Sequence, residues 1–320
     1  MSVINQIQCQ DSIKNTGVCD CYFDPKNFIG AIIAPLATSL SNADLAADAI
    51  AAKFAQLIIT EKKLRIFPFF GWVGIADNSE DATRQTFGFG SQETVREGKY
   101  VLTAEFRKGG LNLNNALRSF NGKQSKYGVF FIDAENTLIG TTVGGQAIKP
   151  IPLEDIYTYP WKANDGSKVT QYRTMFNFDP VYVNENIAFV KADTSTLLFK
   201  ELEGLTDLTI KSVAATNTSI TVKLTTACGE DLYDTYADEL ADVDAFVLAN
   251  ETTGGGITLT SVVKNDTLKA WVITIPTSSN ANYPAAGSKY TVTTASASGL
   301  GGVGVNGYEC INTLSVTRPA

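Results

Sequence analysis

The sequence has no histidine among its 320 residues. Histidine is the commonest general base in enzymes, a member of Ser-His-Asp triads and the commonest zinc ligand. The sequence also lacks a P-loop, a GxSxG motif and an HExxH motif. Carboxylate or lysine chemistry does not need histidine, so these absences disfavour an enzyme without excluding one. We expect no catalytic residue, no cofactor and no metal site, and hence a structural protein.

Cysteine is scarce and irregularly placed, at Cys9, Cys19, Cys21, Cys228 and Cys310. An odd number at scattered spacing is not the pattern of a secreted disulfide framework. Cys19 and Cys21 would form half of a metal site, but neither a second close pair nor a histidine accompanies them. Free thiols are the preferred interpretation, and whether Cys228 and Cys310 approach each other stays open.

Long apolar runs are missing as well. Residues 31–40 and 43–59 are the longest apolar stretches, and both are too short or too interrupted by charge to span a bilayer. The first residues lack the charged segment and apolar core of a signal peptide. We therefore expect no membrane contact, and a protein that stays in the cytoplasm until assembly.

The net charge is −7 at pH 7, which disfavours a general nucleic-acid coat but suits a wall that DNA passes without sticking. Residues 1–205 hold 20 Lys and Arg against 22 Asp and Glu, a net charge of −2. Residues 206–320 hold 6 against 11, a net charge of −5. Two surfaces of different charge predict two domains, residues 1–205 and residues 206–320.

Residues 1–205 predict an α+β domain. Apolar residues at helical spacing predict a helix over residues 41–58, with Ser41 or Asn42 as its cap. A shorter helix is predicted over residues 111–120 and ends at an Asn-Gly pair. Runs of strand-forming residues predict strands at residues 99–106, 127–132, 137–143, 169–178 and 187–190, of which 127–143 form a hairpin.

Residues 206–320 predict an all-β domain. Turn signals separate strand-length runs at residues 208–213, 219–225, 245–248, 258–263, 270–275, 290–294 and 313–317. Short strands of this number in about 110 residues are typical of an immunoglobulin-like β-sandwich. Trp271 is predicted to lie in the core of one sheet.

Several motifs have competing interpretations. Gly88-Phe89-Gly90 resembles the start of a nucleotide-binding loop but lacks the third glycine, so a strand with close backbone approach is preferred. The acids of residues 77–81 and the polar residues 165–167 lack the ligand spacing of a calcium loop, so exposed turns are preferred there.

Acidic and aromatic clusters also leave alternatives open. Residues 230–244 hold seven acids, and they indicate either a solvated loop with a helical turn or an acidic rim facing a partner. A carboxylate-based glycosidase needs two acids beside a groove, and no pair stands out among 33. The aromatic residues of 67–72 and 157–161 would suit a sugar platform, but core or subunit contacts are preferred.

The stretch from residue 148 to residue 167 has the composition of a long, ordered, functional loop. Its prolines would hold it extended, and its aromatic rings would anchor it on a neighbouring subunit. The residues predicted to make such contacts are Ile148, Pro150, Pro152, Tyr157, Tyr159 and Trp161.

A resemblance to a known family rests on three segments. Residues 77–81 leading to 92–100, residues 127–141, and residues 165–178 followed by 184–186 resemble structural proteins of tailed phages. Within that group the chain is most similar to the major tail, or tail tube, proteins. The likeness covers about residues 60–200, whereas residues 1–40 match nothing that we place.

The resemblance implies an antiparallel β-sandwich with a flanking helix, here residues 41–58, and a long loop, here about 144–168. It implies assembly as stacked hexameric rings around a DNA conduit in the virion, together with other virion proteins, and an immunoglobulin-like C-terminal domain. A capsid, decoration or baseplate protein is the alternative, and a carbohydrate-binding adhesin centred on residues 206–320 is a further one.

Overall fold

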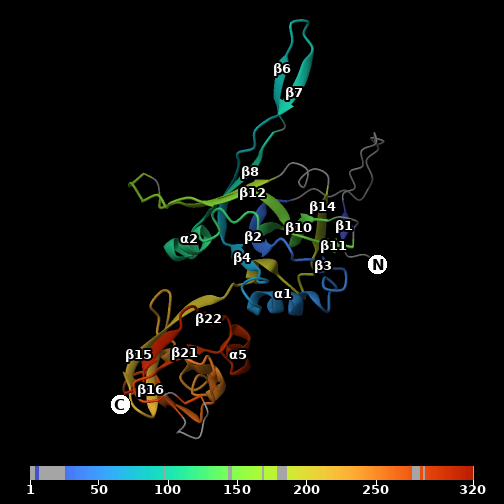
Figure 1. The fold of residues 1–320 in the computed structure, drawn as a ribbon. Helices are drawn as coiled ribbons and strands as arrows, with labels where there is room; N and C mark the ends of the chain where they lie inside the picture. The colour runs from blue at the N-terminus through green and yellow to red at the C-terminus, as the bar shows by residue number, and fades with distance from the viewer. Residues whose placement is uncertain are drawn as a thin grey trace. The chain divides into compact units, whose positions relative to one another are not determined.

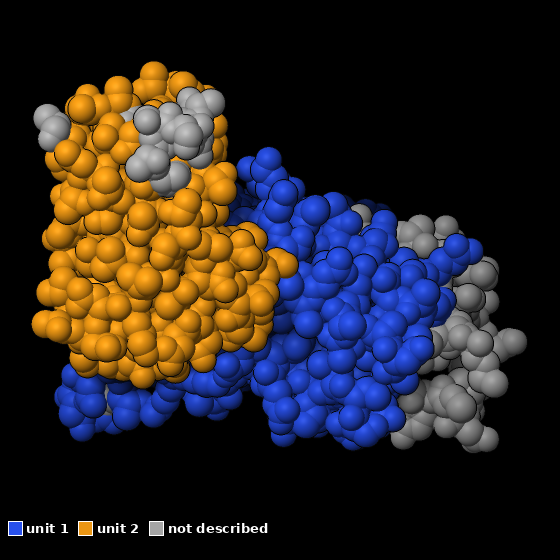
Figure 2. All heavy atoms as spheres, turned by 90° about the horizontal axis from the view of Figure 1, so that it is seen from below, with its two compact units in different colours: residues 1–204 blue, residues 205–320 orange. Residues whose placement is uncertain are grey.

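The computed structural model describes residues 4–6, 26–96, 98–142, 146–167, 169–178, 186–275, 282–283 and 285–319. The chain divides into two compact units, unit 1 (Met1–Gly204) and unit 2 (Leu205–Ala320), which Figure 2 colours separately. The division falls at the change of composition near residue 205. Both units consist mainly of strands (Figure 1), so the prediction of a β-rich protein is confirmed.

The first sheet of unit 1 is centred on β9 (Tyr127–Asp133). This strand pairs with β2 (Phe28–Pro35) on one side and forms a hairpin with β10 (Thr137–Thr141), as predicted. The remaining antiparallel pairs join β2 to β4 (Phe67–Phe70), β10 to β14 (Ile187–Lys191), and β14 to β1 (Asn5–Gln6). A separate short pair joins β3 (Leu40–Ser41) to β11 (Ala147–Ile148).

A second sheet continues from the first through β12 (Ile151–Thr158). The start of β12 pairs with β9 and the rest pairs with β13 (Tyr172–Phe178). The sheet then runs through β8 (Tyr100–Phe106) to its last strand, β5 (Trp72–Asp77). A register shift between Leu153 and Asp155 marks a bulge in β12. An extra residue of this kind moves the following side chains to the opposite faces of the sheet.

The two sheets of unit 1 enclose an aromatic core. Val129 and Phe131 of β9 are buried there with Ile156 and Phe176 of the second sheet. The ring of Phe131 lies 5.8 Å from that of Phe176 and 5.4 Å from that of Phe178, both in edge-on geometry. Such rings bury a large apolar area, which is the dominant favourable contribution to folding.

Helix α1 (Ile50–Ile59) buries Ile50, Phe54 and Ile58. The predicted helix over residues 41–58 is therefore wrong in its first half, where residues 42–49 form turns. There the Asp44 carboxylate accepts from the Ser41 N–H at 2.9 Å, and the Ser41 hydroxyl oxygen accepts from the Asp44 N–H at 3.3 Å. Side-chain bonds of this type satisfy the backbone outside a helix and so compete with helix formation.

Helix α2 (Gly110–Arg118) confirms the second predicted helix, with slightly different ends. Leu117 and Phe120 are buried in the core of unit 1. The following turn is tied to the end of β12, because the Asn121 side chain accepts from the Thr158 N–H at 2.7 Å and donates to its carbonyl at 3.2 Å.

A buried asparagine fixes the segment that leads out of unit 1. Asn136, in the turn between β9 and β10, has a left-handed φ of 64°. Its amide nitrogen donates to the carbonyls of Leu197 at 2.7 Å and Ala192 at 3.3 Å, and its amide oxygen accepts from the Phe199 N–H at 2.9 Å. Phe199 begins the 3-10 helix η1 (Phe199–Glu201) and packs edge-on against Phe54 at 5.2 Å. One side chain thus connects a hairpin turn to a segment 56 to 63 residues later.

The predicted long loop over residues 148–167 is wrong in its first half, since Ile148 ends β11 and residues 151–158 form β12. Ile151, Leu153 and Ile156 are buried. Ile151 and Leu153 are two residues apart and so lie on the same face, and the bulge after Leu153 places Ile156, three residues further on, on that face as well. Composition alone suggested a loop because Pro150 and Pro152 flank the start of the strand. Proline is tolerated where a strand begins.

Unit 2 consists of two sheets and short helical turns. The five-stranded sheet has the order β19 (Ser261–Asn265), β20 (Ala270–Thr274), β16 (Ser219–Thr226), β15 (Thr206–Ala215) and β22 (Tyr308–Cys310). The four-stranded sheet has the order β18 (Gly256–Ile257), β17 (Phe246–Asn250), β21 (Lys289–Thr294) and β23 (Leu314–Thr317). The helical elements are α4 (Tyr233–Tyr236), η2 (Val243–Ala245) and α5 (Ala297–Gly302).

Trp271 is fully buried in the core of unit 2, as predicted, and its indole N–H donates to the Ala237 carbonyl at 3.1 Å. The single strand predicted over residues 258–263 is wrong, because residues 258–260 separate β18 from β19 and these strands belong to different sheets. Cys228 and Cys310 are both free thiols. The other three cysteines, and with them the half metal site, lie outside the described residues. The immunoglobulin-like connectivity stays a prediction.

Candidate assembly surface

The most exposed part of unit 1 is a long projection, residues 72–106, which we call the arm. Its base is the pair β5–β8, and its distal hairpin consists of β6 (Thr83–Thr86) and β7 (Gln92–Arg96). In Figure 1 the distal hairpin stands clear of the rest of unit 1. Every residue of β6 and β7 is exposed, and within the described ranges these two strands pair only with each other.

The tip of the arm is aromatic. The Phe87 N–H donates to the Ser91 carbonyl and the Gly90 N–H to the Phe87 carbonyl, each at 2.8 Å, which closes the turn. Phe89 at the apex is fully exposed and Phe87 is 41% exposed. A side chain added at Gly88 or Gly90 would meet no atom within 4 Å. The predicted strand with close backbone approach is therefore wrong here.

Little within the chain stabilises the distal hairpin. The ion pair between Arg96 and Glu80 spans 3.1 Å, but both side chains are more than half exposed, and such pairs contribute at most about 1 kcal/mol. An isolated two-stranded hairpin is marginally stable in water. An exposed phenylalanine at the tip does not stabilise the hairpin until another apolar surface removes its ring from water. The distal hairpin therefore has the properties of an element that a partner would stabilise.

A second projection extends the hairpin β12–β13. Beyond the strand ends, Lys162 and Gln171 exchange two backbone hydrogen bonds of 3.0 Å. Trp161 beside this bridge is 48% exposed. The turn is formed by Asn164, whose side-chain oxygen accepts from the Gly166 N–H at 2.8 Å. This projection carries a large aromatic side chain into solvent, as the arm does.

Between the two projections, the outer face of the second sheet carries an aromatic cluster. The rings of Tyr157 and Tyr159 lie 5.1 Å apart in edge-on geometry. The guanidinium of Arg173 lies 5.0 Å above the Tyr159 ring, and the Tyr159 hydroxyl donates to Met175 Sδ at 3.5 Å. Tyr157 is exposed, and the other three side chains are half-buried. The bulge in β12 is what turns both tyrosines outward.

Of the six residues predicted to contact a neighbouring copy, three lie at this surface: Tyr157, Tyr159 and Trp161. Ile148 and Pro150 are buried within unit 1, and Pro152 is half-buried in β12. Ile148 and Pro150 therefore support the fold of unit 1 and are not available to a neighbour, whereas a contact at Pro152 stays a prediction. Their burial follows from the sheet that the loop interpretation overlooked.

The arm itself was not predicted from the sequence. The acids of residues 77–81 were assigned to an exposed turn, and they lie at the end of β5 and beyond it, all exposed. The signal was nonetheless present: residues 83–86 and 92–96 are strand-length runs that flank a short glycine-containing turn, which is a hairpin pattern.

The acidic stretch of unit 2, residues 230–244, contains the predicted helical turn as α4. Two lysines of the β19–β20 hairpin pair with it, Lys264 with Asp238 at 2.6 Å and Lys269 with Asp234 at 2.5 Å. The hydrogen bond to its carboxylate partner raises the pKa of each lysine. Part of the acidic charge is thus compensated inside unit 2.

Two tyrosines of unit 2 titrate abnormally. Burial raises the pKa of Tyr233 to about 12, and its hydroxyl also donates to Asp266 at 2.6 Å. Burial raises the pKa of Tyr290 to about 12 as well. In the unfolded chain the hydroxyls of these two tyrosines ionise near the ordinary tyrosine pKa of about 10, whereas in the folded chain they stay protonated at that pH. Stability from these groups is therefore complete below pH 10 and is lost as the pH rises toward 12.

We therefore expect the melting temperature of unit 2 to fall between pH 10 and pH 12, measured by calorimetry across that range. The double variant Tyr233→Phe/Tyr290→Phe should show a shallower fall, because neither ring then carries an ionisable proton. Tyr157→Phe, in unit 1, is the matched control and should leave the fall for unit 2 unchanged. If the melting temperature of unit 2 fell equally in the double variant and the wild type, the loss of stability would not come from Tyr233 and Tyr290.

The described residues contain no group of three or more potential metal-ligating side chains. No described helix combines the length and apolar character needed to cross a membrane. Comparison of the chain with known protein families, with curated proteins and with solved structures found no match.

Proposed function

We propose that this chain is a structural virion protein of a tailed phage, and that it assembles with copies of itself into stacked hexameric rings forming the tail tube. The proposal combines the resemblance of residues 60–200 with the shape of unit 1. In this proposal unit 1 builds the rings, unit 2 is a peripheral domain, and the wall lets DNA pass because its acidic or neutral charge attracts no phosphate.

The exposed distal hairpin is the single observation that carries the proposal. A hairpin with a fully exposed phenylalanine at its apex and no strand partner among the other described strands is best explained by a second molecule that covers it. In a ring of identical subunits, that second molecule is another copy of this chain. Repeated weak contacts between copies become strong together once a ring closes.

The receiving surface in this proposal is the aromatic cluster of Tyr157 and Tyr159 with the neighbouring Trp161. Aromatic side chains are enriched where interfaces have their largest binding contributions. An edge-on or stacked ring from the arm tip would add about 0.5–1.5 kcal/mol for each aromatic pair beyond its buried area.

The test is the assembly state of the purified full-length chain. Sedimentation velocity over a hundredfold range of concentration should show species that grow with concentration, and negative-stain images should show rings or tubes with six-fold symmetry. Particles of five-fold or three-fold symmetry would favour a capsid or decoration protein instead. A monomer at every concentration would overturn the proposal.

A further inference from the structure

The surface around α2 is basic although the protein is acidic. Residues 107–126 contain five cations and no acid, whereas unit 1 as a whole has an excess of acids. The five are Arg107, Lys108, Arg118, Lys123 and Lys126, and all are exposed. We call them the α2 cationic surface.

Most of this charge has no counterpart. Lys108 pairs with Glu203 at 3.3 Å, but both side chains are more than three-quarters exposed. For Arg107, Arg118, Lys123 and Lys126, the described part of the chain supplies no carboxylate within ion-pair distance. Like charges held together without counter-charges repel one another. An acidic partner would relieve that repulsion.

The same helix presents an apolar side chain beside the cations. Leu111 is 43% exposed, and Arg118 follows seven residues later on the same face of α2. The helix buries Asn114 and Leu117, whereas Leu111 and Arg118 are exposed and able to contact a partner. The surface therefore combines a hydrophobic side chain with surrounding positive charge.

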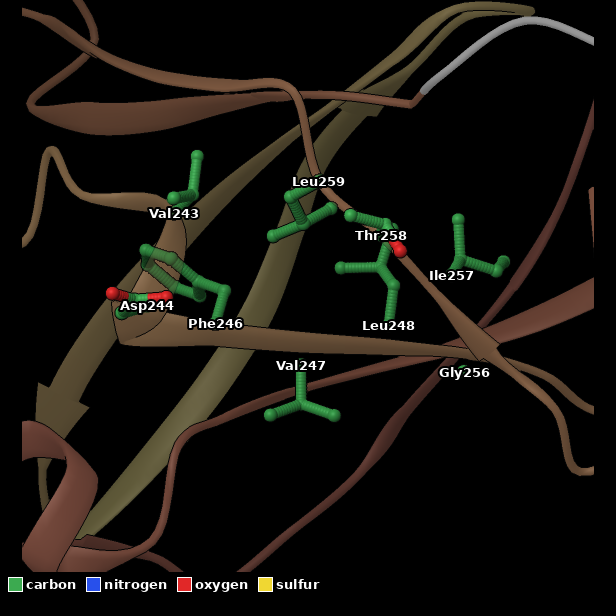
Figure 3. Close-up of a pocket in the computed structure, with 9 residues that line it drawn as sticks. All are labelled: Val243, Asp244, Phe246, Val247, Leu248, Gly256, Ile257, Thr258 and Leu259. Atoms are coloured by element: carbon green, nitrogen blue, oxygen red, sulfur yellow. The ribbon is translucent and has the colours of Figure 1, made fainter. Parts of the chain in front are cut away.

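The acidic stretch of unit 2 has the complementary composition. Four of its seven acids form no ion pair with a described residue: Glu230, Glu239, Asp242 and Asp244. Asp244 lies beside a hollow of about 370 Å³, and Figure 3 shows Phe246 and Leu248 on one face of β17 and Val247 on the other. Val243 and Val247 are 38% and 48% exposed there. Strand β18 is only two residues long and leaves the first half of β17 without a neighbouring strand on that side.

We propose that the α2 cationic surface of one copy docks on the acidic stretch of unit 2 of a second copy, with the residues around the hollow as the apolar part of the contact. This inference rests on the proposed function, because it names a contact of the same assembly. Two different surfaces meet, so the contact is heterologous and propagates from copy to copy into a ring or a filament. Opposed charges accelerate such encounters and select the register more than they add affinity.

Two reasons favour the acidic stretch of unit 2 as the partner of the α2 cationic surface. The arm carries six acids and three bases, whereas residues 230–244 carry seven acids and no base, so the acidic stretch offers the stronger negative field. A nucleic acid would also pair with the cations, but it would leave the four acids without ion pairs and the exposed Val243 and Val247 beside the hollow of unit 2 without a partner. A second copy pairs the α2 cationic surface with the acidic stretch and covers the exposed apolar side chains of both.

Charge reversal in the full-length chain tests this contact. A unit 1 variant carries Arg118→Glu, Lys123→Glu and Lys126→Glu, and a unit 2 variant carries Glu230→Lys, Glu239→Lys and Asp244→Lys. Each alone should raise the concentration needed for association by about tenfold or more, measured by sedimentation at 100 mM salt. An equimolar mixture of the two variants should associate again, because each then meets an opposite charge on the other. The control Lys63→Glu/Lys149→Glu/Lys200→Glu changes the charge equally at exposed sites outside both surfaces and should associate as the wild type does.

The outcomes separate the two proposals. If the wild type never associates, the proposed function fails and this contact fails with it. If the wild type associates and both reversal variants do so equally well, only this contact is overturned. If each variant is impaired but the mixture is not restored, the charges are not paired between copies and the contact is also overturned. If the unit 1 variant associates normally but loses binding to DNA that the wild type shows, the cations serve a nucleic acid instead.

Discussion

Replacing residues 81–97 by the two-residue turn Asn-Gly is expected to abolish assembly while leaving unit 1 folded. The replacement removes the distal hairpin and both tip phenylalanines but keeps the base of the arm, where the Asn78 N–H donates to the Val101 carbonyl at 2.8 Å. Because β6 and β7 pair only with each other among the described strands, unit 1 loses almost none of its own packing. Sedimentation should show a monomer at every concentration at which the wild type assembles.

A single substitution at the tip tests the role of the arm in assembly without removing the hairpin. Phe89→Ser alone should weaken assembly by roughly tenfold to a hundredfold, since truncating an aromatic residue central to an interface costs on the order of 2 kcal/mol. Val263→Ser removes an exposed apolar side chain in unit 2 and is the matched control, with no expected effect. The thermal transition of unit 1 should be unchanged in both. Normal assembly of the shortened protein would refute the role given to the arm.

Asn136→Ala is expected to destabilise unit 1 by on the order of 3 kcal/mol or more. The change leaves two carbonyl groups and one N–H without the partners that the Asn136 side chain supplies, and each unsatisfied buried group costs about 1–3 kcal/mol. It also places alanine at a left-handed φ, which costs about a further 1 kcal/mol. Denaturant unfolding of the full chain measures the loss, and the transition of unit 2 serves as an internal reference.

Two further variants separate the contributions. Asn136→Gly removes the side chain but tolerates the backbone conformation, so it should be less damaging than alanine. Asn136→Asp keeps an acceptor for the Phe199 N–H but directs a carboxylate oxygen at two carbonyls, so it should be at least as damaging as alanine. The control Asn164→Ala removes an exposed turn bond of 2.8 Å and should cost well under 1 kcal/mol. A loss that small at Asn136 would show that the three bonds contribute little.

Patterns that depend on local sequence were predicted correctly. The hairpin of residues 127–143, the strands ending at Phe106 and Phe178, and helix α2 all follow from alternation or helical spacing within a single segment. The burial of Trp271 followed from the same kind of pattern. Periodicity is informative wherever one face of an element is buried and the other is not.

The errors occurred where tertiary context overrides local pattern. Residues 42–49 have helical composition, but the reciprocal bonds of Ser41 and Asp44 hold them in turns. Residues 148–158 have loop-like composition, but they pair with two different strands. The arm was missed because its strands are polar and all exposed, so they lack the alternation of an ordinary strand and only the turn between them indicated a hairpin. The burial of Ile148 and Pro150 was missed because it depends on the register of the sheet, and the contacts assigned to Tyr157, Tyr159 and Trp161 stay a prediction.

The bulge in β12 decides in one step which side chains the aromatic cluster presents. Upstream of it Ile151 and Leu153 point inward, and downstream Ile156 and Thr158 do. If the strand kept its length but lost the bulge, plain alternation from Leu153 would turn Tyr157 and Tyr159 inward and Ile156 outward. Deleting Glu154 together with the bulge would keep Ile156 inward and both tyrosines outward. The cluster therefore depends on whether the number of residues paired between Leu153 and Ile156 is odd or even and not on the identity of residue 154, so substitutions at Glu154 should leave the cluster in place.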